Sequence, residues 1–318
     1  MKNKCLYCYK GLEDVGKMFH PSCCKKLFGK PEPPKLPHTE NELMELGLQI
    51  VKSQSAITGV QSKLSLNIIK EEVIDNPLRL TIVGVHGQYI LKPQTDAFPF
   101  LPEVEDLTMH LAEIAGIATV PHSLMQMKSG KLAYITKRIN RTTKRKIHME
   151  DMCQLTERLT EYKYHGSIEQ IGKVIMKFSA NPGLDIVNFY EQVLFCFLTG
   201  NADMHLKNFS LINYPEIGYI LSPAYDMVST AIVIPEDKEE LALSLNGKKK
   251  KKKLNDFMKA MINSGIPDRT QKNIVDKMEA SLPTIIDFIK NSFLPSYMQQ
   301  RYRDIIETRA RQLHLKIL

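Results

Sequence analysis

Three polar residues in the second half of the chain have the types and the spacing that phosphoryl transfer requires. Asp203 is followed five residues later by Asn208, and Asp226 comes about twenty residues after that. In such a set one carboxylate orients the attacking hydroxyl and accepts its proton, while an amide oxygen and a second carboxylate hold Mg²⁺ against the ATP phosphates. We therefore predict that Asp203 is the catalytic base and that Asn208 and Asp226 are ligands of Mg²⁺.

Short strands are predicted on both sides of this set. Residues 209–213 alternate between apolar and polar after the first loop, and residues 219–221 form an apolar run shortly before Asp226. An Asp and an Asn at this spacing also arise by chance in loops. The prediction therefore depends on finding the other parts of a kinase upstream.

A lysine and a glutamate in the first half of the chain supply those parts. Tyr89 to Pro93 reads as an apolar strand that delivers Lys92 to its end, and Glu105 is predicted to open a helix that Gly116 stops. A strand lysine braced by a glutamate on the next helix is the ion pair of protein kinases. Alone, Lys92 would be a solvated edge charge and Glu105 a residue serving the helix dipole. In this order, with the downstream set, they favour a kinase.

Several segments together carry a more specific pattern. They are Ile57 to Leu66, Tyr89-Ile90-Leu91-Lys92, Leu101-Pro102-Glu103-Val104-Glu105, His148 to Gln154, Lys163-Tyr164, Gly200 to Phe209, Pro223-Ala224-Tyr225-Asp226 and Leu243 to Lys248. From about residue 50 to the C-terminus the chain thus resembles the HipA family of serine/threonine kinases, the toxins of bacterial toxin–antitoxin modules. The resemblance implies a two-lobed kinase-like fold, ATP and Mg²⁺ as cofactors, and a protein substrate, often an aminoacyl-tRNA synthetase.

The resemblance also implies which residues contact the nucleotide. The implied ATP-binding positions are Thr58, Gly59, Val60 and Gln61 in the phosphate loop, the strand lysine Lys92, the residues Lys137, Arg138 and Ile139 in the interlobe hinge region, and His205. The family commonly carries a phosphorylatable serine three residues before the loop glycine, and Ala56 stands there in this chain. Ser55 and Thr58 are therefore the expected sites of autophosphorylation.

The layout of the chain indicates partners. A full-length HipA has an additional N-terminal subdomain ahead of the Gly-Val-Gln segment, whereas only about fifty residues precede it here. This layout resembles HipT, the kinase of three-gene modules. The resemblance implies a small HipS-like partner, a DNA-binding HipB-like antitoxin, and contact with DNA that is indirect or weak.

The first residues of the chain form a separate pattern. Cys5, Cys8, His20 and Cys23 have the spacing C-x2-C-x11-H-x2-C, in which each close pair can place two ligands on one tetrahedral Zn²⁺. The alternative is a short helical hairpin in which the cysteines fill a small core. A disulfide framework is not expected in a cytosolic kinase. The proline-rich residues 31–37 are predicted to be a stiff linker.

Composition and charge are compatible with a kinase but do not distinguish it from other soluble proteins. A hydrophobic content of 43% and a charged content of 25% are typical of a soluble globular protein. No apolar run approaches about 20 residues and no signal peptide opens the chain, so we expect a cytoplasmic protein without membrane contact. The net charge of +8 indicates an acidic partner such as a nucleotide. Much of this charge lies in the lysine run Lys248–Lys253. The run follows a predicted strand at 241–245 and a predicted turn at Asn246-Gly247, so we expect its side chains to be solvated.

These elements predict an α+β, two-lobed kinase-like fold with a small mixed N-lobe and a larger, mainly helical C-lobe. The predicted domains are 1–37 for the Cys/His segment and linker, 38–140 for the N-lobe and 141–318 for the C-lobe. The predicted elements are a helix at 38–52, strands at 62–69, 79–85, 88–93, 119–126 and 131–137, and mostly helices from His148 onward.

Two other functions stay open on the residues alone. The first is a pseudokinase scaffold that binds antitoxin and DNA without catalysis. The second is a lipid kinase, because the fold resembles phosphoinositide kinases. The intact set of Lys92, Asp203, Asn208 and Asp226 disfavours the scaffold, and the lack of a membrane-binding segment disfavours the lipid kinase.

Overall fold

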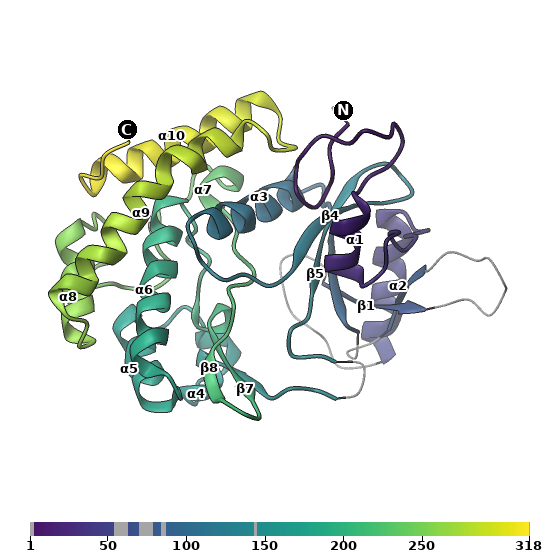
Figure 1. The fold of residues 1–318 in the computed structure, drawn as a ribbon. Coiled ribbons are helices and arrows are strands. Elements are labelled where there is room, and N and C mark those ends of the chain that lie inside the picture. The colour runs from purple at the N-terminus through teal and green to yellow at the C-terminus, as the bar shows by residue number, and fades with distance from the viewer. Residues whose placement is uncertain (1–2, 54–62, 70–78, 84–86, 143–144, 318) are drawn as a thin grey trace. The chain divides into compact units, whose positions relative to one another are not determined.

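The structure is a computed structural model that describes residues 3–53, 63–69, 79–83, 87–142 and 145–317 (Figure 1). The chain forms two compact units. The N-terminal unit comprises residues 1–106 and 120–145, and the C-terminal unit comprises residues 107–119 and 146–318. Helix and sheet are mixed, as the predicted α+β class requires.

A five-stranded sheet forms the centre of the N-terminal unit. Its order is β2-β1-β3-β5-β4, and every neighbouring pair is antiparallel. The strands are β1 (Leu64–Ile69), β2 (Arg79–Ile82), β3 (Tyr89–Pro93), β4 (His122–Gln126) and β5 (Leu132–Lys137). The middle strand, β3, has four of its five side chains buried, Lys92 among them. The predicted strands are therefore present, and Lys92 lies on the central one.

The helices of the N-terminal unit have clear sequence signals at their ends. Helix α1 (Pro21–Phe28) begins with a proline, whose missing N–H costs nothing in the first turn, and ends at Gly29 in the left-handed conformation. Helix α2 (Glu40–Ser53) starts with a capping box, in which Thr39 and Glu42 exchange hydrogen bonds of 2.7 and 3.3 Å. The two ends of α1 and the start of α2 therefore agree with the chemistry of helix capping.

Helix α3 (Leu101–Ile114) starts earlier than predicted, so Glu105 does not open it. Pro102 is accommodated within the first turn, where its missing N–H has no helical partner to lose. Glu105 therefore lies in the second turn. The helix runs through the boundary between the two units, with residues 101–106 in the first.

The C-terminal unit is mainly helical, as predicted. Its α-helices are α4 (Met152–Leu155), α5 (Ile168–Phe178), α6 (Pro182–Leu198), α7 (Thr230–Val233), α8 (Leu254–Asn263), α9 (Asp268–Ile289) and α10 (Ser296–Gln312). Helix α6 is buried along most of its length and packs against α5, α9 and α10 (Figure 1). A helix that is apolar on nearly all sides belongs at the centre of a bundle. Among the described residues, no helix is long and apolar enough to cross a membrane.

A three-stranded antiparallel sheet lies in the same unit, with the order β6-β7-β8. Strands β7 (Ser210–Tyr214) and β8 (Gly218–Leu221) match the strands predicted around the candidate site. The prediction of helix directly from His148 is wrong, since β6 (Met149–Asp151) pairs with β7. Three residues give no periodicity of their own, and the pairing partner lies about sixty residues away.

The lysine run differs from its predicted solvated state. Asn246 and Gly247 have positive φ angles and Leu245 pairs with Lys248, as expected of the turn, but no strand forms at 241–245. Lys252 is fully buried, its backbone N–H donates to Glu240 Oε2 at 2.9 Å, and its Nζ lies 4.0 Å from the same carboxylate. One of the six lysines is thus part of the packed interior.

This burial predicts a pH-dependent stability. Desolvation lowers the pKa of Lys252 from 10.5 to about 8. Between these values the unfolded chain binds more protons than the folded one, so the free energy of unfolding should rise with pH from about 8 to 10.5, by at most about 3 kcal/mol. Denaturant titrations should show this rise in the wild type and in Lys250→Met, an exposed neighbour, but not in Lys252→Met. Parallel curves for all three proteins would contradict it.

Candidate active site

The predicted ion pair of the N-terminal unit is present. Lys92 Nζ lies 2.5 Å from Glu105 Oε1, and both side chains are buried. Two elements position this pair. Strand β3 places Lys92 at the centre of the sheet, and the second turn of α3 places Glu105 opposite it. The Lys92 Nζ also lies 5.4 Å from the ring centroid of Tyr134, its cross-strand neighbour on β5. The role of this pair in binding phosphates stays a prediction.

The loop after α6 carries Asp203 and is anchored at its start. Gly200 has a φ of +66°, and an added Cβ would lie 2.8 Å from the Cβ of Ala231, so only glycine fits there. The N–H of Ala202 donates to Thr230 Oγ1 at 2.9 Å. The fully buried Asn201 accepts a hydrogen bond from the N–H of Asp203 at 3.1 Å. The close packing of Gly200 and the two hydrogen bonds therefore fix the backbone that carries Asp203.

Asn208 and Tyr164 contact Asp203 directly. The Nδ2 group of Asn208 donates to the Asp203 carbonyl at 2.9 Å, which places both predicted residues on one closed turn. The hydroxyl of Tyr164 donates to Asp203 Oδ1 at 2.5 Å. Burial and this carboxylate both raise the pKa of Tyr164, so the hydroxyl remains a donor at neutral pH.

The segment that carries Asp226 is tied to the same loop. The hydroxyl of Tyr225 donates to the Lys207 carbonyl at 3.0 Å and lies 2.5 Å from Ser210 Oγ. Asp226 follows with a φ of +60°, a left-handed conformation that few non-glycine residues adopt and that Asp tolerates better than most. Such backbone strain persists only where the surroundings hold it in place, and it clusters at functional sites.

His205 lies in the field of both carboxylates. Burial lowers its pKa to about 4, and the attraction of Asp203 and Asp226 offsets only part of this effect. The imidazole is therefore neutral at pH 7. Its Nδ1 is buried and has no hydrogen-bond partner among the described residues, while the ring packs edge-on against Tyr164 at 4.9 Å. An unpaired buried ring nitrogen is available for a hydrogen bond to a ligand.

Of the other predicted ATP-binding positions, the structure describes those in the hinge region but not those in the phosphate loop. Lys137 ends β5, and the backbone N–H groups of Lys137 and Arg138 donate to Pro121 and Gln88. Burial lowers the pKa of the Arg138 guanidinium. Ile139 follows in the turn after β5. The predicted phosphate-loop and autophosphorylation positions lie outside the described residues: Ser55, Thr58, Gly59, Val60 and Gln61.

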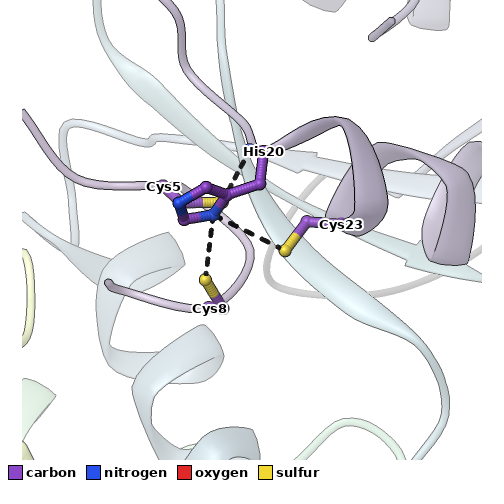
Figure 2. A group of neighbouring side chains, drawn as sticks. All are labelled: Cys5, Cys8, His20 and Cys23. Atoms are coloured by element: carbon purple, nitrogen blue, oxygen red, sulfur yellow. Dashed lines mark hydrogen bonds between the residues drawn. The ribbon is translucent and has the colours of Figure 1, made fainter. Parts of the chain in front are cut away.

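The four candidate zinc ligands do come together. One ligand atom from each of Cys5, Cys8, His20 and Cys23 lies within 4.8 Å of every other (Figure 2). This cluster belongs to the N-terminal unit.

Sequence reasoning missed two tyrosines. Lys163-Tyr164 contributed to the family resemblance, but nothing in the sequence linked Tyr164 to Asp203, 39 residues away. In the sequence Tyr225 is only the neighbour of Asp226, and nothing there indicates its contacts with Lys207 and Ser210. An aromatic residue with a hydroxyl immediately before a predicted metal ligand is a weak signal, because its partner cannot be read from spacing.

A family model described as HipA-like C-terminal domain matches residues 55–286. The chain belongs to this family. Relatives of this HipA-like chain include a protein named "Putative kinase" in Haemophilus influenzae, which is 28% identical over 89% of this chain and 87% of its own length. Another, "Putative kinase Y4mE" of Sinorhizobium fredii, is 26% identical over 82% of this chain and 64% of its own length.

Two solved structures share the fold of this HipA-like chain. One is a chain of the Shewanella oneidensis complex of HipA, HipB and operator DNA, with a TM-score of 0.67 and 18% identity over 89% of this chain and 73% of its own. The other is the Helicobacter pylori proinflammatory kinase CtkA, with a TM-score of 0.54 and 15% identity over 79% of this chain and 93% of its own. The likeness confirms the predicted kinase-like fold.

Proposed function

We propose that this chain is an ATP-dependent serine/threonine protein kinase and the toxin of a bacterial toxin–antitoxin module. The observation that supports this most is the closed loop that holds Asp203 and Asn208 together and is joined through Tyr225 to the segment bearing Asp226. A base, an amide and a second carboxylate in that order are the working parts of a kinase. The buried Lys92–Glu105 pair in the other unit is the second support.

Each residue has a definite task in this proposal. Asp203 keeps Oδ2 for the substrate hydroxyl while Tyr164 holds Oδ1, so the carboxylate is oriented before it accepts the proton. Asn208 and Asp226 offer an amide and a carboxylate oxygen, the hard ligands that suit Mg²⁺. When bound, Mg²⁺ neutralises charge on the ATP phosphates.

Lys92 and His205 complete the set. Lys92 contacts the phosphates, and Glu105 holds its ammonium group in place. Neutral His205 can donate or accept one hydrogen bond through its unpaired Nδ1, depending on the tautomer.

The partners are proposed on the same footing. The HipA-containing structure from Shewanella oneidensis includes HipB and operator DNA. By analogy we propose a HipB-like antitoxin as partner, with DNA contacted through it, and a protein substrate phosphorylated in the cytoplasm, where ATP is available. The small HipS-like partner stays a prediction from the sequence.

A labelling experiment tests this function. Purified protein incubated with γ-labelled ATP and Mg²⁺ is expected to phosphorylate itself, with the label mapping to Ser55 or Thr58. Cells that express it should contain phosphoproteins that are absent from cells expressing Asp203→Ala. If the wild type binds ATP yet yields no labelled protein in either setting, the kinase proposal is wrong and a scaffold takes its place.

A further inference from the structure

The first 28 residues contain a compact cluster of sulfur and imidazole that the proposed kinase does not use. Cys5 and Cys8 lie in a tight hairpin closed by the pairing of Lys4 with Gly11. His20 immediately precedes α1, and Cys23 lies in the first turn of that helix. Figure 2 shows the three sulfur atoms arranged around the His20 ring. Two chain segments therefore converge on one point, each with two ligands.

The distances in the cluster are those of a tetrahedral metal site. Zinc bonds of about 2.3 Å to sulfur and about 2.0 Å to nitrogen place neighbouring ligand atoms about 3.5 to 3.8 Å apart. His20 Nδ1 lies 3.4 Å from Cys8 Sγ and 3.8 Å from Cys23 Sγ. All four ligand atoms lie within 4.8 Å of one another. A Zn²⁺ ion would therefore require only small adjustments of the side chains.

The hydrogen bonds around the cluster orient its ligands for a metal. The Nε2 of His20 lies 3.0 Å from the carbonyl of Gly11, which can only accept, so Nε2 carries the proton and Nδ1 presents its lone pair to the sulfurs. Such an outer hydrogen bond fixes the tautomer of metal-bound histidines. The backbone N–H of His20 donates to Cys5 Sγ at 3.4 Å. Tyr9, with a φ of +61°, turns the chain directly after Cys8.

The alternative is that the cysteines only fill a small core. Cys24 is the cysteine of this segment that fits that role. Its side chain is fully buried beside Cys23, yet it is not among the four clustered ligands. All six cysteines are free thiols, so a disulfide does not account for the cluster. A core filler has no need of an imidazole aimed at three sulfurs.

We infer that Cys5, Cys8, His20 and Cys23 bind one Zn²⁺ ion as a closed structural site. Three thiolates and one imidazole select zinc over harder cations, and four protein ligands leave no position for catalysis. The metal would order the segment that contacts the rest of the N-terminal unit. Within that segment the Leu6 carbonyl accepts from Ser123 Oγ at 3.0 Å, and the Tyr9 hydroxyl donates to Asp106 Oδ2 at 2.8 Å.

Elemental analysis of the full chain purified without chelators tests the site. We expect about one zinc per chain in the wild type and in Cys24→Ala, the matched control for loss of a buried thiol from α1. The double variant Cys5→Ser/Cys8→Ser should contain none. Zinc absent from the wild type, or retained at full stoichiometry by the double variant, would overturn the inference.

A second measurement on wild-type protein avoids variants that fail to fold. Protein produced with Co²⁺ in place of zinc should show the intense visible bands of tetrahedral cobalt with thiolate ligands. Stepwise modification of its thiols should bleach those bands in proportion to the metal released. Weak bands of octahedral cobalt, or metal release that is independent of thiol modification, would place the ion elsewhere and refute the site.

Discussion

Replacing Asp203 by asparagine is expected to slow phosphoryl transfer at least about 100-fold, because the positioned base is lost. Asparagine keeps the shape and an oxygen for the Tyr164 hydroxyl, so the melting temperature should change little. Transfer of labelled phosphate from ATP to the protein itself or to a model substrate measures the first, and a thermal melt measures the second. The control is Glu216→Gln, which removes an exposed carboxylate from the same unit.

Asp226→Asn extends the same test to the metal. Asparagine also tolerates the left-handed backbone at this position, so the change removes a charge without adding strain. We expect a similar loss of transfer and, in addition, loss of the rise in melting temperature that ATP produces only with Mg²⁺. Tyr164→Phe should cost less, about tenfold, since the base remains. Near wild-type transfer by either aspartate variant would refute the assignment.

Breaking the buried pair of Lys92 and Glu105 should give the second large effect. Lys92→Met removes the ammonium group from a buried ion pair and keeps the Glu105 carboxylate, which costs about 3–5 kcal/mol of unfolding free energy. The double variant Lys92→Met/Glu105→Leu should recover most of that loss, because both charges are then absent. Transfer activity should not recover, since the lysine is also required for the phosphates.

Urea titration measures the stabilising role of the pair, and the transfer assay measures its role in catalysis. Both are applied to the wild type, Lys92→Met, Lys92→Met/Glu105→Leu and a control variant. Lys131→Met is the control, because its ion pair with Glu40 lies in the same unit but is partly exposed, so its loss should change stability much less. Recovery of both stability and transfer in the double variant would show that the pair is only structural.

The parts of the fold that could be predicted are those with local signals. Strand β7 alternates between apolar and polar residues, β8 follows as an apolar run after a short turn, and capping residues mark where several helices begin. The candidate zinc ligands could be found because their pairs are close in sequence, so spacing alone restricts their geometry. Lys92 and Glu105 are separated by only 13 residues, one strand and one helix.

What could not be predicted depends on distant partners. Six consecutive lysines look equivalent in the sequence, but Lys252 also contacts Gln312, 60 residues away, whose Nε2 donates to the Lys252 carbonyl at 2.9 Å. Strand β6 exists because β7 is there to pair with it. The hydroxyl of Tyr9 meets Asp106 across 97 residues of sequence, a contact that no local pattern announces.

The contacts of residues 1–53 bear on where this protein may be divided. The family match begins at residue 55, yet α1 packs on the sheet ahead of that point: the Tyr89 hydroxyl donates to the Leu27 carbonyl at 3.1 Å, and the Phe28 ring lies 5.8 Å from the Tyr89 ring. Tyr9 bonds Asp106, the residue next to Glu105. A chain begun at residue 55 would expose the outer face of β3 and withdraw a hydroxyl donor from α3. The start of the family match is therefore not a limit of folding, and the helix that carries Glu105 takes part of its support from residues that the family model does not cover.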